Sequence, residues 1–138
     1  IIHGGIDDIW FDLNEKKLVV VDYKAQSSTY PITVSSYLES EWHLSYKLQM
    51  DIYVHILRKM NFNVSDISYF YVCNGVKTNN KFDNKIDFTT TLIPYRVDTS
   101  WIEKKLSEMK DVLNSEIVPD VDKSCEKCAY LKGGKDFF

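Results

Sequence analysis

Two segments near the start of the chain have the residue pattern of β-strands. Residues 6–13 predict a strand that ends in the polar residues 14–17. Residues 18–25 predict a second strand, which opens with the four apolar residues from Leu18 to Val21. A continuous apolar run of this kind is typical of a strand that is covered on both faces. The polar residues between the two segments therefore predict a hairpin.

The middle of the chain changes from strand to helix periodicity. A stripe of residues at helical spacing predicts one long helix over residues 37–60. The members of that stripe are Trp42, Tyr46, Gln49, Tyr53, Ile56 and Met60. A loop over residues 26–31 precedes this helix, and residues 61–65 end it.

The second half of the chain predicts two further strands and a helix. The strands are expected at residues 67–73 and 86–97, separated by a turn at Asn74–Gly75 and a polar loop over residues 77–85. Asp98 or Thr99 can cap a helix that begins near Trp101. The order strand, strand, helix, strand, strand, helix predicts an α/β fold with a mixed central sheet flanked by helices.

Composition favours one globular domain over residues 1–138. Of the 138 residues, 44% are hydrophobic and 27% are charged, which excludes a disordered or low-complexity protein. The apolar runs are too short to span a bilayer, so no membrane partner is expected. The three cysteines are an odd number, which fits a reducing compartment and predicts a cytoplasmic protein.

The charge balance bears on the partner. Lysine and arginine total 17 against 20 acidic residues, a net charge of -3, and the only arginines are Arg58 and Arg96. A protein that holds nucleic acid by charge alone is usually basic. A polyanionic partner would therefore need a bridging metal cation or a local basic patch, for which the best candidates are Lys77, Lys81 and Lys85.

The candidate chemistry lies where the second strand ends. Asp22 and Lys24 follow the apolar run and point to the same face, because side chains alternate along a strand. A hairpin loop over residues 14–17 would pair residue 7 with residue 24 and residue 9 with residue 22, which puts Asp7 on that face too. A slip of one residue would exchange Asp7 for Asp8, so both stay candidates.

This grouping suits a hard divalent cation. Two carboxylates and the Tyr23 backbone carbonyl offer oxygen ligands for Mg²⁺ or Mn²⁺, with water completing the octahedron. Such a metal polarises a phosphoryl oxygen, and Lys24 would orient or deprotonate the attacking water or stabilise developing charge. The simpler alternative is a solvated ion pair at the end of a surface hairpin.

Three motifs in order resemble those of a known family. Gly4-Gly5-Ile6-Asp7-Asp8 precedes Val19-Val20-Val21-Asp22-Tyr23-Lys24, and Gln49 and Tyr53 follow four residues apart. Together they resemble the PD-(D/E)XK nuclease superfamily, in particular its RecB-like branch, which includes CRISPR-associated exonucleases with an iron–sulfur cluster.

The resemblance implies a restriction-endonuclease-like core that hydrolyses DNA phosphodiesters with Mg²⁺ or Mn²⁺, often from an end. It implies that Asp7, Asp22 and the Tyr23 carbonyl bind the metal and that Lys24 is the catalytic lysine. It further implies that Gln49 orients the site or a DNA phosphate and that Tyr53 contacts the site or the DNA. DNA repair, recombination, or phage and mobile-element processing would be the setting.

Two features depart from the RecB-like pattern. That pattern has an upstream helical segment with a histidine or acidic ligand, which we expect this chain to lack, so a larger polypeptide or an assembly partner would supply it. Cys125 and Cys128 have metal-ligand spacing but lack two further cysteines. An iron–sulfur cluster or Zn²⁺ there is therefore the less expected outcome. The alternative function is a non-catalytic nuclease-fold module for DNA-end binding or protein assembly.

Overall fold

The computed structural model describes residues 1–77, 84–117, 120–122 and 124–134. The chain divides into two compact units, Ile1–Ile102 and Glu103–Phe138.

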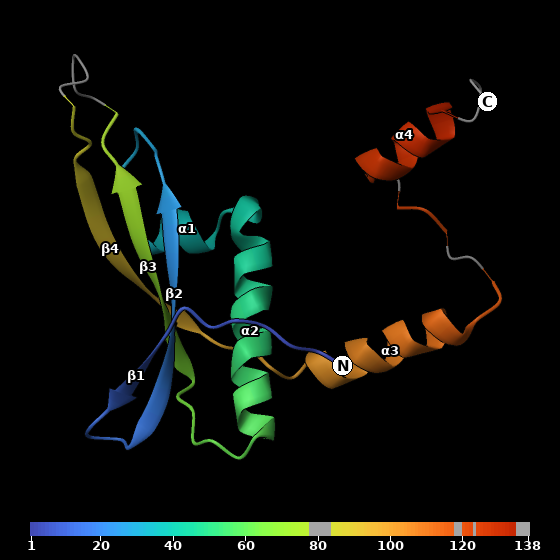
Figure 1. Cartoon of the computed structure of the whole chain (residues 1–138), viewed down its shortest axis with the longest axis horizontal. Helices are drawn as coiled ribbons and strands as arrows, with labels where there is room; N and C mark the ends of the chain where they lie inside the picture. The colour runs from blue at the N-terminus through green and yellow to red at the C-terminus, as the bar shows by residue number, and fades with distance from the viewer. Residues whose placement is uncertain (78–83, 118–119, 123, 135–138) are drawn as a thin grey trace. The chain divides into compact units, whose positions relative to one another are not determined.

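The first unit is built on a four-stranded sheet (Figure 1). Its strands are β1 (Asp8–Asp12), β2 (Lys17–Gln26), β3 (Ile67–Gly75) and β4 (Phe88–Arg96), in that spatial order. The β1–β2 and β3–β4 pairs are antiparallel, whereas β2 and β3 run parallel. This arrangement confirms the predicted mixed sheet.

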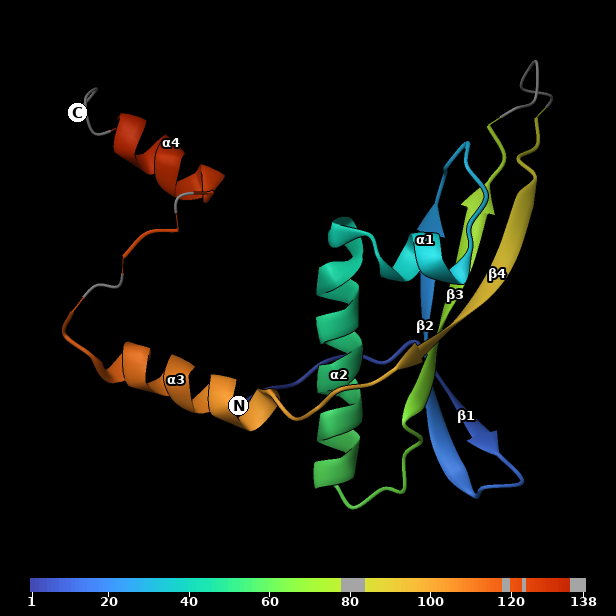
Figure 2. The ribbon, with the colours of Figure 1, turned by 180° about the vertical axis from the view of Figure 1, so that it is seen from behind.

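The segment between β2 and β3 supplies the helices of this unit. It contains α1 (Val34–Leu38), the short 3₁₀ helix η1 (Glu41–His43) and α2 (Leu44–Lys59), and α2 lies along one face of the sheet (Figure 2). The predicted single helix over residues 37–60 was wrong at its start. Thr33 caps α1 in a capping box with Ser36, and the chain is extended again at Ser40.

The core of this unit lies between the sheet and α2. Its buried members include Val20, Phe70, Val72 and Ile93 from the sheet, Met50, Val54 and Leu57 from α2, and Tyr37 from α1. Along the predicted helical stripe Tyr53 is buried, whereas Trp42 and Met60 at the two ends are 89% and 60% exposed. Trp42 lies in η1, where a tighter 3₁₀ turn changes the phase of the stripe.

Strand β3 runs through the predicted turn at Asn74–Gly75, so that prediction was wrong. The buried Asn74 side chain accepts a hydrogen bond from Ser28 N at 2.7 Å and donates one to Ser28 O at 3.1 Å. These two hydrogen bonds pair both the oxygen and the nitrogen of the Asn74 side-chain amide. Asn74 can therefore be buried within the strand. In the polar loop that follows, residues 78–83, including Lys81, lie outside the described residues.

The second unit carries two helices. Helix α3 (Ile102–Asn114) begins at the last residue of the first unit, close to the predicted start at Trp101, and α4 is Glu126–Gly134. Across the part of the chain that the structure describes, no helix combines the length and apolarity needed to cross a membrane.

Candidate metal and catalytic site

Strand β2 places Asp22 and Lys24 on the face that α2 covers. Asp22 is 3% exposed, and the Lys24 side chain is 17% exposed. Lys24 Nζ lies 2.5 Å from Asp22 Oδ2. The two side chains therefore form an ion pair that is largely shielded from water.

Asp7 reaches the same place from the residue before β1. Its Oδ2 accepts a hydrogen bond from the backbone N–H of Tyr23 at 2.8 Å, directly beside Asp22. Asp7 is exposed, so its carboxylate remains open to solvent. One buried and one open carboxylate thus meet at the middle of β2.

The hairpin register differs from the predicted one by two residues. Asp8 pairs with Val21 and Asp12 with Lys17, so the loop is residues 13–16 and residue 9 lies opposite Val20. The Asp12 carboxylate accepts backbone hydrogen bonds from Asn14 and Glu15, which closes the loop earlier than predicted. A shift of two residues keeps every side chain on its predicted face.

Asp8 lies apart from this group. Its Oδ2 accepts hydrogen bonds from Tyr23 OH at 2.7 Å and from Trp10 Nε1 at 2.9 Å. These contacts engage the side chain of Tyr23, which points to the opposite face from Asp22. Of the two candidates, Asp7 is the carboxylate that lies beside Asp22.

The local electrostatics leave Asp22 short of positive charge. Burial raises the pKa of Asp22, the neighbouring Asp7 raises it further, and Lys24 lowers it. Apart from the ion pair with Lys24, Asp22 Oδ2 has no hydrogen-bond partner. A cation between the two carboxylates would stabilise both in their ionised form.

Two residues of helix α2 extend the series of polar side-chain contacts that starts at Asp22. Lys24 Nζ donates a hydrogen bond to Gln49 Oε1 at 3.2 Å, and Gln49 Nε2 donates one to Tyr53 OH at 2.6 Å. The four-residue spacing of Gln49 and Tyr53 places both on one face of the helix. The structure thus brings together Asp7, Asp22, Lys24, Gln49 and Tyr53.

Gly4 lies against the ring of Tyr53, which leaves little room for a side chain at this position. A Cβ atom at Gly4 would lie 2.7 Å from Cε1 of Tyr53. The Tyr53 ring, whose hydroxyl is hydrogen-bonded to Gln49, would have to shift to make room. The close approach explains why a glycine precedes Asp7 at this distance.

The donor set fits Mg²⁺ or Mn²⁺ better than a softer metal. Mg²⁺ is usually held by one or two carboxylates and keeps several waters, and the buried oxygen of Asp22 has no hydrogen bond to lose. Within residues 1–77, 84–117, 120–122 and 124–134, no group of three or more His, Cys, Asp or Glu side chains could hold a metal ion. Asp7 and Asp22 offer a pair of carboxylates, the number that Mg²⁺ commonly takes from a protein while it keeps several waters.

Cys125 and Cys128 lie at the start of α4, in the second unit. Cys128 N donates a hydrogen bond to Cys125 Sγ at 3.4 Å. Hydrogen bonds from Cys128 lower the pKa of Cys125. Two thiols are fewer than the four ligands of a closed zinc or iron–sulfur site.

Sequence reasoning missed Tyr46 of α2 as a contributor to the site and Asp51 of α2 as a buried hydrogen-bond acceptor outside it. Lys24 Nζ lies 4.4 Å from the centroid of the Tyr46 ring. The buried Asp51 accepts hydrogen bonds from Tyr95 OH, Asp98 N and Trp101 Nε1 at 3.0–3.1 Å. The available signal for Asp51 was its place as the only acidic residue between Leu48 and Leu57, a largely apolar stretch.

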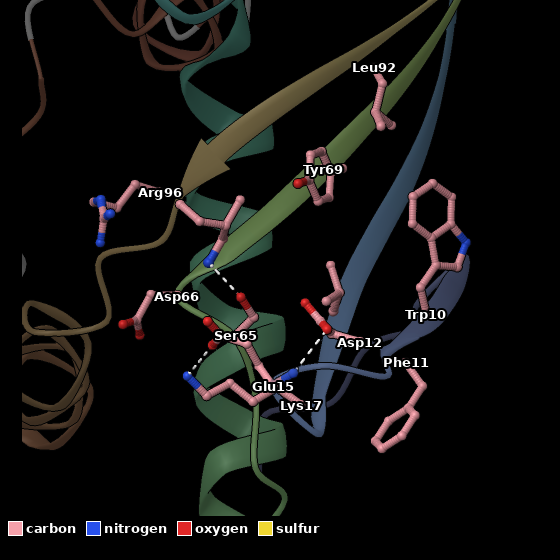
Figure 3. Close-up of a pocket in the computed structure, with 12 residues that line it drawn as sticks. Trp10, Phe11, Asp12, Glu15, Lys17, Ser65, Asp66, Tyr69, Leu92 and Arg96 are labelled. Atoms are coloured by element: carbon pink, nitrogen blue, oxygen red, sulfur yellow. Dashed lines mark hydrogen bonds and ion pairs between the residues drawn. The ribbon is translucent and has the colours of Figure 1, made fainter.

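A separate cavity of about 540 Å³ lies on the sheet face that α2 does not cover (Figure 3). Its lining includes Trp10, Tyr69, Leu92 and Arg96 but none of the site residues described above. Its charged residues are of both signs, with Lys17 bound to Glu15 at 2.8 Å. It therefore offers no concentration of positive charge for a phosphate backbone.

The family comparison agrees with the geometry. The model of the PD-(D/E)XK nuclease superfamily matches residues 1–132, and the chain belongs to that superfamily. Its members are generally nucleases, and they typically use divalent metals. Comparisons with curated proteins and with solved structures give no match.

Proposed function

We propose that this chain is a metal-dependent DNA nuclease in which Asp7, Asp22 and the Tyr23 carbonyl hold Mg²⁺ or Mn²⁺. The observation that carries the proposal is the buried Asp22 carboxylate, which lies beside Asp7 and has Lys24 as its sole charged partner among the described contacts. Such an arrangement is costly to bury unless a further cation offsets it. The superfamily supplies phosphodiester hydrolysis as the matching chemistry.

Each polar residue has a distinct part in this proposal. The metal would polarise the phosphoryl group and lower the pKa of a bound water. Lys24 orients that water or stabilises charge that develops on the phosphoryl oxygens. Gln49 holds Lys24 through its Oε1 atom, and Tyr53 fixes the Gln49 amide.

Support for the finer assignment comes from helix α2. The Gln49–Tyr53 pair, in hydrogen-bond contact with Lys24, supports a RecB-like enzyme that acts on DNA ends in repair, recombination or mobile-element processing. The net charge of -3 makes a bridging cation the expected link to DNA. The odd number of cysteines supports action in the reducing cytoplasm.

The test is a cleavage assay. Linear and circular DNA, single- and double-stranded, are incubated with the chain and Mg²⁺, Mn²⁺ or EDTA. Asp22→Asn and Lys24→Met are compared with the matched controls Asp66→Asn and Lys17→Met, which change an exposed acid and the hairpin lysine.

We expect metal-dependent cleavage that falls by about 100-fold or more in both site variants and stays within about twofold in both controls. Preference for linear over circular DNA would indicate an exonuclease. DNA binding with neither cleavage nor Mn²⁺ binding that depends on Asp22 would contradict the proposal and favour the non-catalytic module. Equal activity in Asp22→Asn and the wild type would remove Asp22 from the mechanism.

A further inference from the structure

The Lys24 ammonium group has a third neighbour besides Asp22 and Gln49. Its Nζ atom lies 4.4 Å from the centroid of the Tyr46 ring, within the range of a cation–π interaction. Asp22 and Gln49 contact the same nitrogen through oxygen atoms. The face of the Tyr46 ring therefore limits the directions in which Lys24 Nζ can move while it keeps its contacts with Asp22 and Gln49.

Tyr46 is itself held by stacked rings. The His43 and Tyr46 rings have centroids 5.5 Å apart and planes inclined by 18°. His43 stacks in turn on Tyr37 at 4.0 Å, and its Nδ1 atom is hydrogen-bonded to the Tyr37 carbonyl at 2.8 Å. The Tyr37 ring packs against Phe70 of β3 at 5.6 Å.

These contacts form a continuous stack from the core to the site, from Phe70 through Tyr37, His43 and Tyr46 to Lys24. The stack explains why the chain interrupts the expected long helix. The break between α1 and α2 allows Tyr37 and His43 to overlap. One straight helix would not, because residues six apart are separated by about 120° around the helix and about 9 Å along it.

We propose that Tyr46 is a positioning residue that holds the Lys24 ammonium group between Asp22 and Gln49 through its ring face. A lysine side chain has several rotatable bonds, and its reach to the reacting phosphate depends on how many conformers it samples. The catalytic consequence rests on the proposed nuclease function, whereas the effect on Lys24 geometry does not.

The chemistry predicts which substitutions matter. Because the contact is with the ring centroid, Tyr46→Phe keeps the cation–π partner and Tyr46→Leu removes it. Tyr69→Leu is the matched control, since Tyr69 is also half-buried but lies on the sheet face away from α2.

The first measurement is steady-state cleavage by these variants. Tyr46→Leu should lower kcat by about 2- to 30-fold and leave KM little changed. This range is the strength of a cation–π interaction converted into a ratio of rates. Tyr46→Phe and Tyr69→Leu should stay within about twofold of wild type. A loss in Tyr46→Phe as large as in Tyr46→Leu, or an equal loss in Tyr69→Leu, would overturn the proposal.

The second measurement needs no activity and keeps the two proposals separable. Carbon–proton NMR of lysine side chains, with Lys24 assigned by its absence in Lys24→Met, reports ring shielding of the Lys24 ε-methylene protons. We expect an upfield shift in the wild type and in Tyr46→Phe that disappears in Tyr46→Leu. An unchanged shift in Tyr46→Leu would overturn the positioning role, whereas shielding without any cleavage would contradict only the nuclease proposal.

Discussion

Replacing Lys24 by methionine tests how the site balances its charges. Methionine keeps most of the length of the side chain but removes the ammonium group that lies 2.5 Å from Asp22 Oδ2. The side chains of this pair are only 17% and 4% exposed, so water cannot replace the lost partner. Removing one member of a buried ion pair typically costs about 3–5 kcal/mol of stability, and we expect Lys24→Met to lie in that range near neutral pH.

The loss should depend on pH in a defined direction. In the folded protein, burial already raises the pKa of Asp22, and Lys24 opposes that rise. Without Lys24 the folded-state pKa rises further above the unfolded value, so the stability that this group contributes is lost as pH rises through the folded value. The deficit of Lys24→Met is therefore smallest at low pH, where Asp22 takes up a proton, and grows as the pH rises.

Urea denaturation without added metal, at several pH values between 5 and 8, measures this deficit. The double variant Asp22→Asn/Lys24→Met should recover most of it, because no buried charge is left unpaired. A deficit that does not change with pH would refute the reasoning. A double variant no more stable than Lys24→Met would do the same.

Three further substitutions test the surroundings of the site. Asp8→Asn should leave cleavage within about twofold of wild type, because Asp8 binds Tyr23 OH and Trp10 rather than the Asp22 group; a loss like that of Asp7→Asn would reverse the assignment. Gly4→Ala should lower kcat on the order of 10- to 100-fold with little change in the melting temperature, since the new methyl group displaces the Tyr53 ring; full activity would exclude that role. Asp51→Ala should cost about 3 kcal/mol in urea denaturation, because three donors lose their acceptor, while the folded fraction keeps its activity; a cost below about 1 kcal/mol would contradict the hydrogen-bond assignment.

Local sequence patterns predicted the sheet because each strand has its own signal. The apolar run before Asp22 marks a strand buried on both faces, and alternation then fixes Asp22 and Lys24 on one face. The face of Asp7 was also correct, although the register was wrong by two residues, because a strand repeats every two residues. Register depends on how the turn closes, which the Asp12 side chain decides here.

The segment between β2 and β3 could not be predicted in the same way. Its helical periodicity is real, but the capping box at Thr33 and the tertiary stacking of Tyr37 on His43 break the helix into three parts. Tyr46 has the same spacing as core residues, and only the fold shows that its ring faces Lys24. The periodicity of a sequence does not report contacts between residues that are distant in that sequence.

Divalent metal binding tests the central claim most directly, because it depends on neither DNA nor turnover. Calorimetric titration of the chain with Mn²⁺ should show one site whose affinity falls at least about 10-fold in Asp22→Asn and in Asp7→Asn, since each loses a charged ligand. The Asp8→Asn variant should bind as the wild type does. Mn²⁺ binding that is unchanged in both Asp7→Asn and Asp22→Asn would contradict the metal site at these two carboxylates.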